Sequence, residues 1–179
     1  MGIISLGHVG LKLLKLLQQF DFNILVYENY YLSEDDVKKL NVKKVGLDEL
    51  MSQSDAIALC APNLPQNKHM INAKRLSLMK DNAVFINTAR GALVDETALI
   101  KELKRGRITA FLDVTDPEPP EEGHPFYNLP NCILTPHIAG SIGNECYRLG
   151  KATVDEIKRY LEGRPLKGEI SREGFVYRA

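Results

Sequence analysis

Three residues of the chain, Arg90, Glu118 and His137, have the side chains needed for acid–base chemistry on an anionic substrate. A guanidinium can bind a carboxylate through paired hydrogen bonds. A histidine can give or take a proton near neutral pH, and a neighbouring carboxylate would hold its ring and favour the protonated form. Taken singly, the three could equally be a surface ion pair, a solvated loop acid and a histidine that caps a turn.

The placement of these residues along the chain favours a shared site. The apolar run Ala83–Ile86 is typical of a strand buried on both faces of a parallel sheet, and Arg90 follows it within a small polar segment. Glu118 and His137 likewise follow apolar runs, and prolines flank Glu118 and precede His137. Because ligands of open α/β sheets bind beyond the carboxyl ends of the strands, the three side chains are expected to converge on one crevice.

Strand-like and helix-like stretches alternate from the first residue onward. Strands are predicted over residues 1–6, 23–27, 56–61, 83–86, 108–114 and 132–135. Helices are predicted over residues 11–20, 33–40, 47–53, 72–79, 95–105 and 142–161, with Ser33 and Asp95 as N-caps. This alternation predicts an α/β fold of the Rossmann type, doubly wound, with a mostly parallel sheet and helices on both faces.

The last predicted helix, residues 142–161, is the longest and carries an apolar stripe that we expect to be buried. Gly163 ends this helix and Pro165 prevents its resumption. The stripe consists of Cys146, Leu149, Thr153, Ile157, Tyr160 and Leu161.

The first predicted turn, residues 5–10, reads as a dinucleotide-binding fingerprint in which Ser5 replaces the first glycine. Gly7 would let backbone amides approach a pyrophosphate, and Gly10 would let the helix pack on the strand. Glu28 ends the next strand, where a carboxylate can accept hydrogen bonds from a ribose diol and repel a 2′-phosphate. The pattern therefore favours NAD over NADP; the alternative is an ordinary glycine turn beside a surface acid.

Composition excludes several classes of partner. The 179 residues carry equal numbers of acidic and basic side chains, which gives no reason to expect binding to nucleic acid or to an anionic membrane. No apolar run approaches the length of a membrane span, and the first residues lack the features of a signal peptide. Cys60, Cys132 and Cys146 fit neither a disulfide framework nor a metal site, so we expect reduced cysteines in a cytoplasmic protein.

Three segments together resemble the D-isomer-specific 2-hydroxyacid dehydrogenases, in the part that binds the nucleotide. They are NTARG at 87–91 with the following ALVDETAL, LDVTDPEP at 112–119, and LPNCILTPHIAG at 129–140. The resemblance implies that Arg90 binds the substrate carboxylate and carbonyl, that Glu118 partners the histidine, and that His137 is the acid/base. It also implies cofactor contacts at Gly7, His8, Val9, Gly10, Glu28, Ala61, Pro62, Asn67, Thr88, Ala89, Arg90, Asp113, His137, Ala139 and Gly140.

The resemblance also implies a domain organisation. Residues 1–163 correspond to the NAD-binding Rossmann domain, which begins inside its first strand, and residues 164–179 to a segment that would return to a substrate domain missing from the chain. The resemblance further implies a homodimer formed through this domain. Ser5 for glycine, Glu28 for aspartate and Asn67 for threonine depart from the family pattern.

Three functions are consistent with this resemblance. The first is hydride transfer between NAD(H) and a small D-2-hydroxy acid or 2-keto acid, with glyoxylate and hydroxypyruvate as candidates. The second is NAD binding without catalysis by an isolated domain. The third is an NAD-responsive interaction protein that resembles the dehydrogenases, such as a corepressor.

Overall fold

A computed structural model describes residues 1–28 and 34–175 of the chain. These residues form two compact units, of which the first comprises residues 1–136 and the second begins at His137. Each unit is described separately below. The domain boundary expected at residue 163 stays a prediction.

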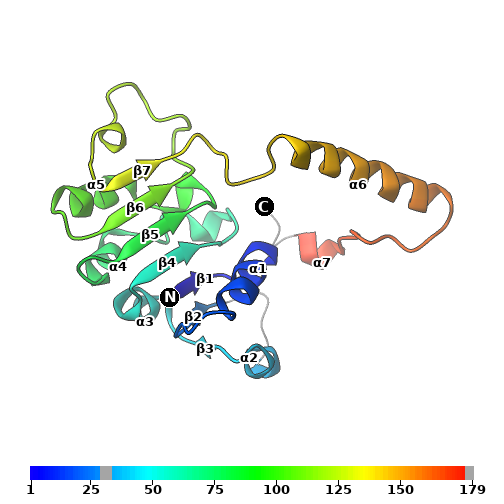
Figure 1. Cartoon of the computed structure of the whole chain (residues 1–179), viewed down its shortest axis with the longest axis horizontal. Helices are drawn as coiled ribbons and strands as arrows, with labels where there is room; N and C mark the ends of the chain where they lie inside the picture. Colours follow the sequence, from blue (N-terminus) through cyan, green and yellow to red (C-terminus); the bar gives the residue numbers. More distant parts are fainter. Residues whose placement is uncertain (29–33, 176–179) are drawn as a thin grey trace. The chain divides into compact units, whose positions relative to one another are not determined.

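The first unit contains one sheet whose seven strands are all parallel within the described residues, in the order β3-β2-β1-β4-β5-β6-β7 (Figure 1). The strands are β1 (Gly2–Ile4), β2 (Leu25–Tyr27), β3 (Lys43–Lys44), β4 (Ala56–Leu59), β5 (Val84–Asn87), β6 (Thr109–Leu112) and β7 (Cys132–Leu134). Six of them confirm the predicted strands. The sequence did not predict β3, because its two exposed lysines give an edge strand no apolar pattern.

The helices agree with the predicted elements in most places. They are α1 (His8–Leu17), α2 (Glu34–Leu40), α3 (Leu47–Gln53), α4 (Ala73–Leu78), α5 (Glu96–Lys104), α6 (Asn144–Leu161) and α7 (Arg172–Phe175). Short 3-10 turns cover Pro65–Asn67, Gly91–Leu93 and Pro125–Tyr127. The predicted cap at Asp95 is confirmed, since its carboxylate accepts the Ala98 N–H at 3.0 Å, whereas the cap expected at Ser33 lies outside the described residues. Neither α7 nor the 3-10 turns were predicted from the sequence.

Helices lie on both faces of the sheet, which confirms the doubly wound class (Figure 1). On one face α3, α4 and α5 pack over a core centred on Ile57 and Phe85. On the other face α1 packs through Leu14 against Ile3 and Val26. The chain moves outward in opposite directions from β1, and right-handed crossovers therefore place the two sets of helices on opposite faces.

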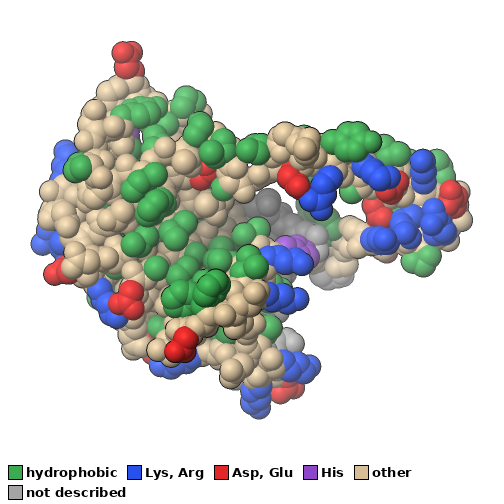
Figure 2. Space-filling view, viewed as in Figure 1, with side chains coloured by type: hydrophobic (Ala, Val, Ile, Leu, Met, Phe, Trp, Pro, Cys, Tyr) green, Lys and Arg blue, Asp and Glu red, His purple; other side chains and the backbone are tan. Residues whose placement is uncertain are grey.

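The α1 face becomes exposed toward β7. Ile3, Ala58, Ile86, Phe111 and Ile133 follow one another in register across the sheet, so their side chains share this face. Ile3 is fully buried, but Phe111 is 43% and Ile133 39% exposed. Figure 2 shows hydrophobic side chains gathered over β5, β6 and β7. Phe111 of β6 and Ile133 of β7 are exposed because α3, α4 and α5 all pack on the opposite face. The strand expected to be buried on both faces, residues 83–86, is buried at Ala83 and Phe85 but only half-buried at Val84 and Ile86.

The second unit corrects another expectation. The apolar stripe predicted to be buried on α6 is exposed, and α6 contains no buried residue among those described. Apolar periodicity shows that a helix is amphipathic, but it does not identify what covers the apolar face. The end of this helix is as expected, since Gly163 adopts a φ of 65° directly after it.

None of the described helices combines the length and the apolar composition needed to cross a lipid bilayer.

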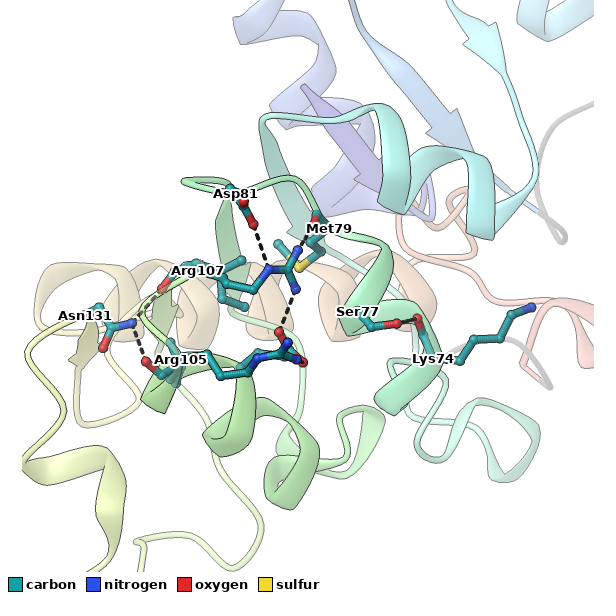
Figure 3. Close-up of polar contacts among 10 residues, drawn as sticks. Lys74, Ser77, Met79, Asp81, Arg105, Arg107 and Asn131 are labelled. Carbon is teal, nitrogen blue, oxygen red and sulfur yellow. Dashed lines mark hydrogen bonds and ion pairs between the residues drawn. The ribbon is translucent and has the colours of Figure 1, made fainter.

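An ion-pair network joins α5 to the amino end of β6, at the sheet edge away from the carboxyl ends (Figure 3). Glu102 of α5 is buried and accepts hydrogen bonds from Arg105 Nη1 at 3.0 Å and Arg107 Nη1 at 2.6 Å. Arg107 also donates through Nε to Asp81 at 2.7 Å and through Nη2 to the Met79 carbonyl at 2.5 Å. One guanidinium thus connects α5, β6 and the loop between α4 and β5.

We predict that Arg107→Ala lowers the free energy of unfolding by about 2 kcal/mol, because it removes a charged hydrogen-bond donor from a buried carboxylate. Urea unfolding of the variant measures this loss. The matched control is Lys104→Ala, an exposed cation on the last turn of α5, which should change stability by less than about 0.5 kcal/mol. Equal midpoints for the two variants would show that Glu102 does not depend on Arg107.

Candidate functional site

The register of the sheet brings four segments of the first unit to one edge. Ile4, Leu59, Asn87 and Leu112 are consecutive partners across β1, β4, β5 and β6, so these strands end at the same level. Three strand spacings separate β1 from β6, or about 14 Å. The segments that follow these strands contain the predicted site residues Gly7, His8, Val9, Gly10, Ala61, Pro62, Thr88, Ala89, Arg90, Asp113 and Glu118.

The turn after β1 shows how serine is accommodated in the glycine pattern. Ser5 adopts a φ of 75°, a left-handed conformation that costs a non-glycine residue roughly 1–2 kcal/mol. Gly7 is the extended N-cap of α1, and its carbonyl accepts the Leu11 N–H at 2.9 Å. A Cβ at Gly10 would lie 2.2 Å from the Ser5 carbonyl oxygen, so only glycine lets α1 approach the strand this closely. The amino end of α1 is thereby held beside the end of β1.

Glu28, which directly follows β2, accepts hydrogen bonds from the same turn. Its carboxylate is 1% exposed, and its Oε2 accepts hydrogen bonds from Ser5 Oγ at 3.0 Å and from the Leu6 N–H. The ribose contact expected of Glu28 stays a prediction.

The segment after β4 is held by an internal amide. Asn67 is buried, and its Nδ2 donates to the Pro62 carbonyl at 2.9 Å. Ala61 is buried and Pro62 half-buried beside it. The contact gives Asn67 a role in shaping the loop, and the cofactor contacts of the three residues stay predictions.

The segment after β5 is built around the buried side chain of Asn87. Its Nδ2 donates to the Arg90 carbonyl at 3.0 Å, and its Oδ1 accepts the Ala89 N–H at 3.0 Å. The backbone of Arg90 is extended, and its exposed guanidinium donates to the Ala89 carbonyl at 2.6 Å. Thr88 is exposed as well. Asn87 thus fixes the backbone of Arg90, whose exposed guanidinium lies at the carboxyl edge of the sheet.

The segment after β6 starts buried and becomes exposed. Asp113 is 5% exposed and accepts a hydrogen bond from Thr135 Oγ1 at 2.5 Å, which links the ends of β6 and β7. The Asp113 N–H donates to the Asn87 carbonyl at 3.0 Å and extends the pairing with β5. Glu118 lies five residues further on, exposed within a proline-rich loop.

His137, Ala139 and Gly140 are exposed and belong to the second unit, while Arg90 and Glu118 belong to the first. His137 has a φ of 53°. The convergence of Arg90, Glu118 and His137 therefore stays a prediction.

Glu96, at the start of α5, is a residue to which sequence reasoning assigned no role. Its Oε1 accepts the Asp116 N–H at 2.9 Å. Burial raises the pKa of Glu96 to about 7; the hydrogen bond from the Asp116 amide opposes this shift and the Asp116 charge adds to it. An acid in the first turn of a helix is common, so this contact with a distant loop could not be predicted from the residue type.

The cysteines show little thiolate character where they are buried. Burial raises the pKa of Cys60 and of Cys132 to about 11, and the Glu96 charge contributes at Cys132. Cys146 is exposed, contrary to its expected place in a buried stripe. Among residues 1–28 and 34–175, no three His, Cys, Asp or Glu side chains are grouped as a metal site would need.

A parallel doubly wound sheet with a glycine turn at a helix N-terminus and an acid after the second strand defines a dinucleotide-binding domain of the Rossmann class. Residues 1–139 match the family model described as D-isomer specific 2-hydroxyacid dehydrogenase, NAD binding domain. The chain belongs to this family.

Relatives and solved structures agree with this assignment. The chain is 32% identical over 171 residues to D-3-phosphoglycerate dehydrogenase of Archaeoglobus fulgidus, covering 95% of this chain and 32% of the relative. It is 35% identical over 167 residues to hydroxypyruvate reductase of Blautia hydrogenotrophica, covering 93% and 51%. A D-isomer specific 2-hydroxyacid dehydrogenase from Xanthobacter autotrophicus Py2, solved with NADPH and MES, superposes with a TM-score of 0.80 at 28% identity, over 97% of this chain and 72% of that one. The chain thus spans about half or less of these two curated relatives.

We predict that Gly10→Ala destabilises the first unit by about 1–3 kcal/mol, because the added methyl group would overlap backbone at the end of β1. Thermal or urea unfolding reports the loss. Gly46→Ala serves as the control, since a Cβ there meets nothing within 4 Å, and its effect should stay below about 1 kcal/mol. A Gly10→Ala variant as stable as this control would contradict the close approach.

Proposed function

We propose that this chain is the NAD-binding domain of an enzyme that transfers a hydride between NAD(H) and a small D-2-hydroxy acid or 2-keto acid. One observation carries the proposal: within a domain of this family, the strand ends bring the turn 5–10, the Arg90 segment and the loop before Glu118 to one sheet edge. The hydroxypyruvate reductase and glyoxylate reductase relatives support small 2-keto acids as the substrate class.

The residues at this edge suit a dinucleotide. Gly10 lets α1 pack closely on the end of β1, and Gly7 at the N-cap lets the backbone amides at the N-terminus of α1 face a pyrophosphate. Glu28 offers a buried carboxylate to a ribose diol. When bound, the nicotinamide supplies the hydride chemistry.

The roles proposed for the three chemical residues follow from their side chains. Arg90 binds and orients the carboxylate of the substrate through its guanidinium. His137 Nε2 or Nδ1 gives a proton to the carbonyl oxygen of a 2-keto acid and accepts it in the reverse direction. Glu118 orients the imidazole ring and favours its protonated form. A homodimer through this domain is part of the same proposal, and size-exclusion chromatography would test it.

The chain spans about half or less of its relatives, and this favours a second candidate function: NAD binding without catalysis by the chain alone. We expect NADH fluorescence titration to show saturable binding by this chain and an assay with glyoxylate or hydroxypyruvate to show no turnover.

In the complete enzyme, His137→Ala should lower turnover by about 10²–10⁴-fold while NADH affinity stays within error, as expected for removal of a general acid. Unchanged turnover would remove His137 from the mechanism, and a chain that does not bind NADH would contradict both candidates.

Cofactor preference depends on Glu28 in this proposal, which takes NAD as the cofactor although relatives solved with NADPH exist. We predict that Glu28→Gln reduces the ratio of NADH to NADPH affinity by about tenfold, because a charged acceptor is replaced by a neutral one. Titrations with both cofactors measure the ratio. Glu121→Gln, at an exposed loop acid, is the control and should leave it unchanged. Equal ratios in wild type and Glu28→Gln would show that another residue sets the preference.

A further inference from the structure

One peptide unit in the Glu118 loop, the bond between Thr115 and Asp116, is contacted from two sides by the segment that follows Arg90. The first contact is the backbone of Gly91. A Cβ at Gly91 would lie 2.1 Å from the Thr115 carbonyl carbon, 2.3 Å from its oxygen and 2.5 Å from the Asp116 nitrogen. The two backbones therefore pack directly on each other, and no side chain fits between them.

The second contact comes from Glu96, whose Oε1 accepts the Asp116 N–H at 2.9 Å. Glu96 is the first residue of α5, and the Asp95 carboxylate fixes this end of the helix by accepting the Ala98 N–H at 3.0 Å. The 3-10 turn Gly91–Leu93 and Val94 join the two contacts along the chain. We call these two contacts, from Gly91 and from Glu96, the clamp. Arg90 directly precedes Gly91 in the chain.

The loop itself has few backbone donors with which to fix its conformation. Pro117, Pro119 and Pro120 have no N–H, so Asp116 and Glu118 supply the only backbone donors in the stretch 116–120. Thr115 is buried and its hydroxyl donates within the loop, to the Pro117 carbonyl at 2.8 Å. The hydrogen bond to Glu96 therefore uses one of two available amides and connects the loop to a helix.

We propose that Gly91 and Glu96 are positioning residues, which hold the Thr115–Asp116 peptide and thereby fix the backbone of Glu118 relative to that of Arg90. Glu118 follows the clamped peptide by two residues, and Arg90 precedes Gly91 by one. The clamp deepens the proposed function, because its catalytic significance depends on Glu118 and Arg90 acting in the same reaction.

The environment of Glu96 makes the clamp sensitive to pH near neutrality. Burial and the neighbouring Asp116 charge raise the pKa of Glu96 from 4.5 to about 7, and the Cys132 thiol also senses the Glu96 charge. The ionised carboxylate accepts a stronger hydrogen bond from the Asp116 amide. Because the folded chain holds this proton more tightly than the unfolded chain, the contribution of Glu96 to stability is present below its ordinary pKa and is lost as pH rises through about 7.

Nuclear magnetic resonance of the ¹⁵N-labelled chain tests the clamp. We expect the Asp116 amide proton to move downfield as pH rises, with a midpoint near 7, and Asp116→Asn to lower this midpoint by removing the neighbouring charge. Glu96→Gln should abolish the titration but keep the Asp116 and Glu118 amides ordered, because an amide oxygen still accepts. Glu96→Ala should lower their order parameters from about 0.85 to below about 0.6.

Glu121→Gln, at an exposed acid later in the loop, is the control and should reproduce the wild-type spectra. Wild-type order parameters at the Asp116 and Glu118 amides in Glu96→Ala would overturn the clamp. An unchanged titration midpoint of the Asp116 amide proton in Glu96→Gln would overturn it as well. Both readouts use the chain without substrate, so they do not depend on Glu118 being catalytic. If the clamp passes this test but a Glu118→Gln variant of the complete enzyme has normal turnover, the result would contradict the proposed function and leave the clamp intact.

Discussion

The parallel register of β1, β4, β5 and β6 is the constraint on which the candidate site depends. Because these four strands end at the same level, the turns that follow them gather at one edge although they are far apart in the sequence. Most of the buried polar residues of the described chain lie at or just beyond this edge. They are Ser5, Glu28, Asn67, Asn87, Asp113 and Thr115, whereas Ser54 and Glu102 lie elsewhere. Buried polar groups need partners, and here hydrogen bonds tie most of them to the loops that follow the strands.

Much of this fold was predictable because its main signals are local. Short apolar runs identified six of the strands, and Asp95 identified the start of α5 through a contact three residues away. Their alternation with helices was sufficient for the fold class. The glycine turn was recognisable for the same reason, since the close approach that excludes a side chain at Gly10 lies within six residues of sequence.

The features that escaped sequence reasoning depend on distant partners. The apolar stripe of α6 has the period of a buried face, yet what covers such a face is not encoded in the period. Phe111 and Ile133 lie in strands with the expected composition, but their exposure follows from the side on which α3, α4 and α5 cross. Glu96 resembles any acid at a helix start, and only the tertiary structure shows that it accepts a hydrogen bond from the Asp116 amide, twenty residues away in a loop.

The serine at the head of the glycine turn carries a consequence for preorganisation. Its hydroxyl and the Leu6 amide both donate to Glu28 Oε2, so the rotamer of this acid is fixed by the folded chain itself. A ligand that uses the carboxylate need not supply the entropy of ordering it, which is about 0.5–1.5 kcal/mol for a flexible side chain. Glycine at position 5 would relax the left-handed backbone but would remove one of these two donors to Glu28. The serine therefore costs backbone strain at position 5 and in return orders the Glu28 carboxylate before any ligand binds.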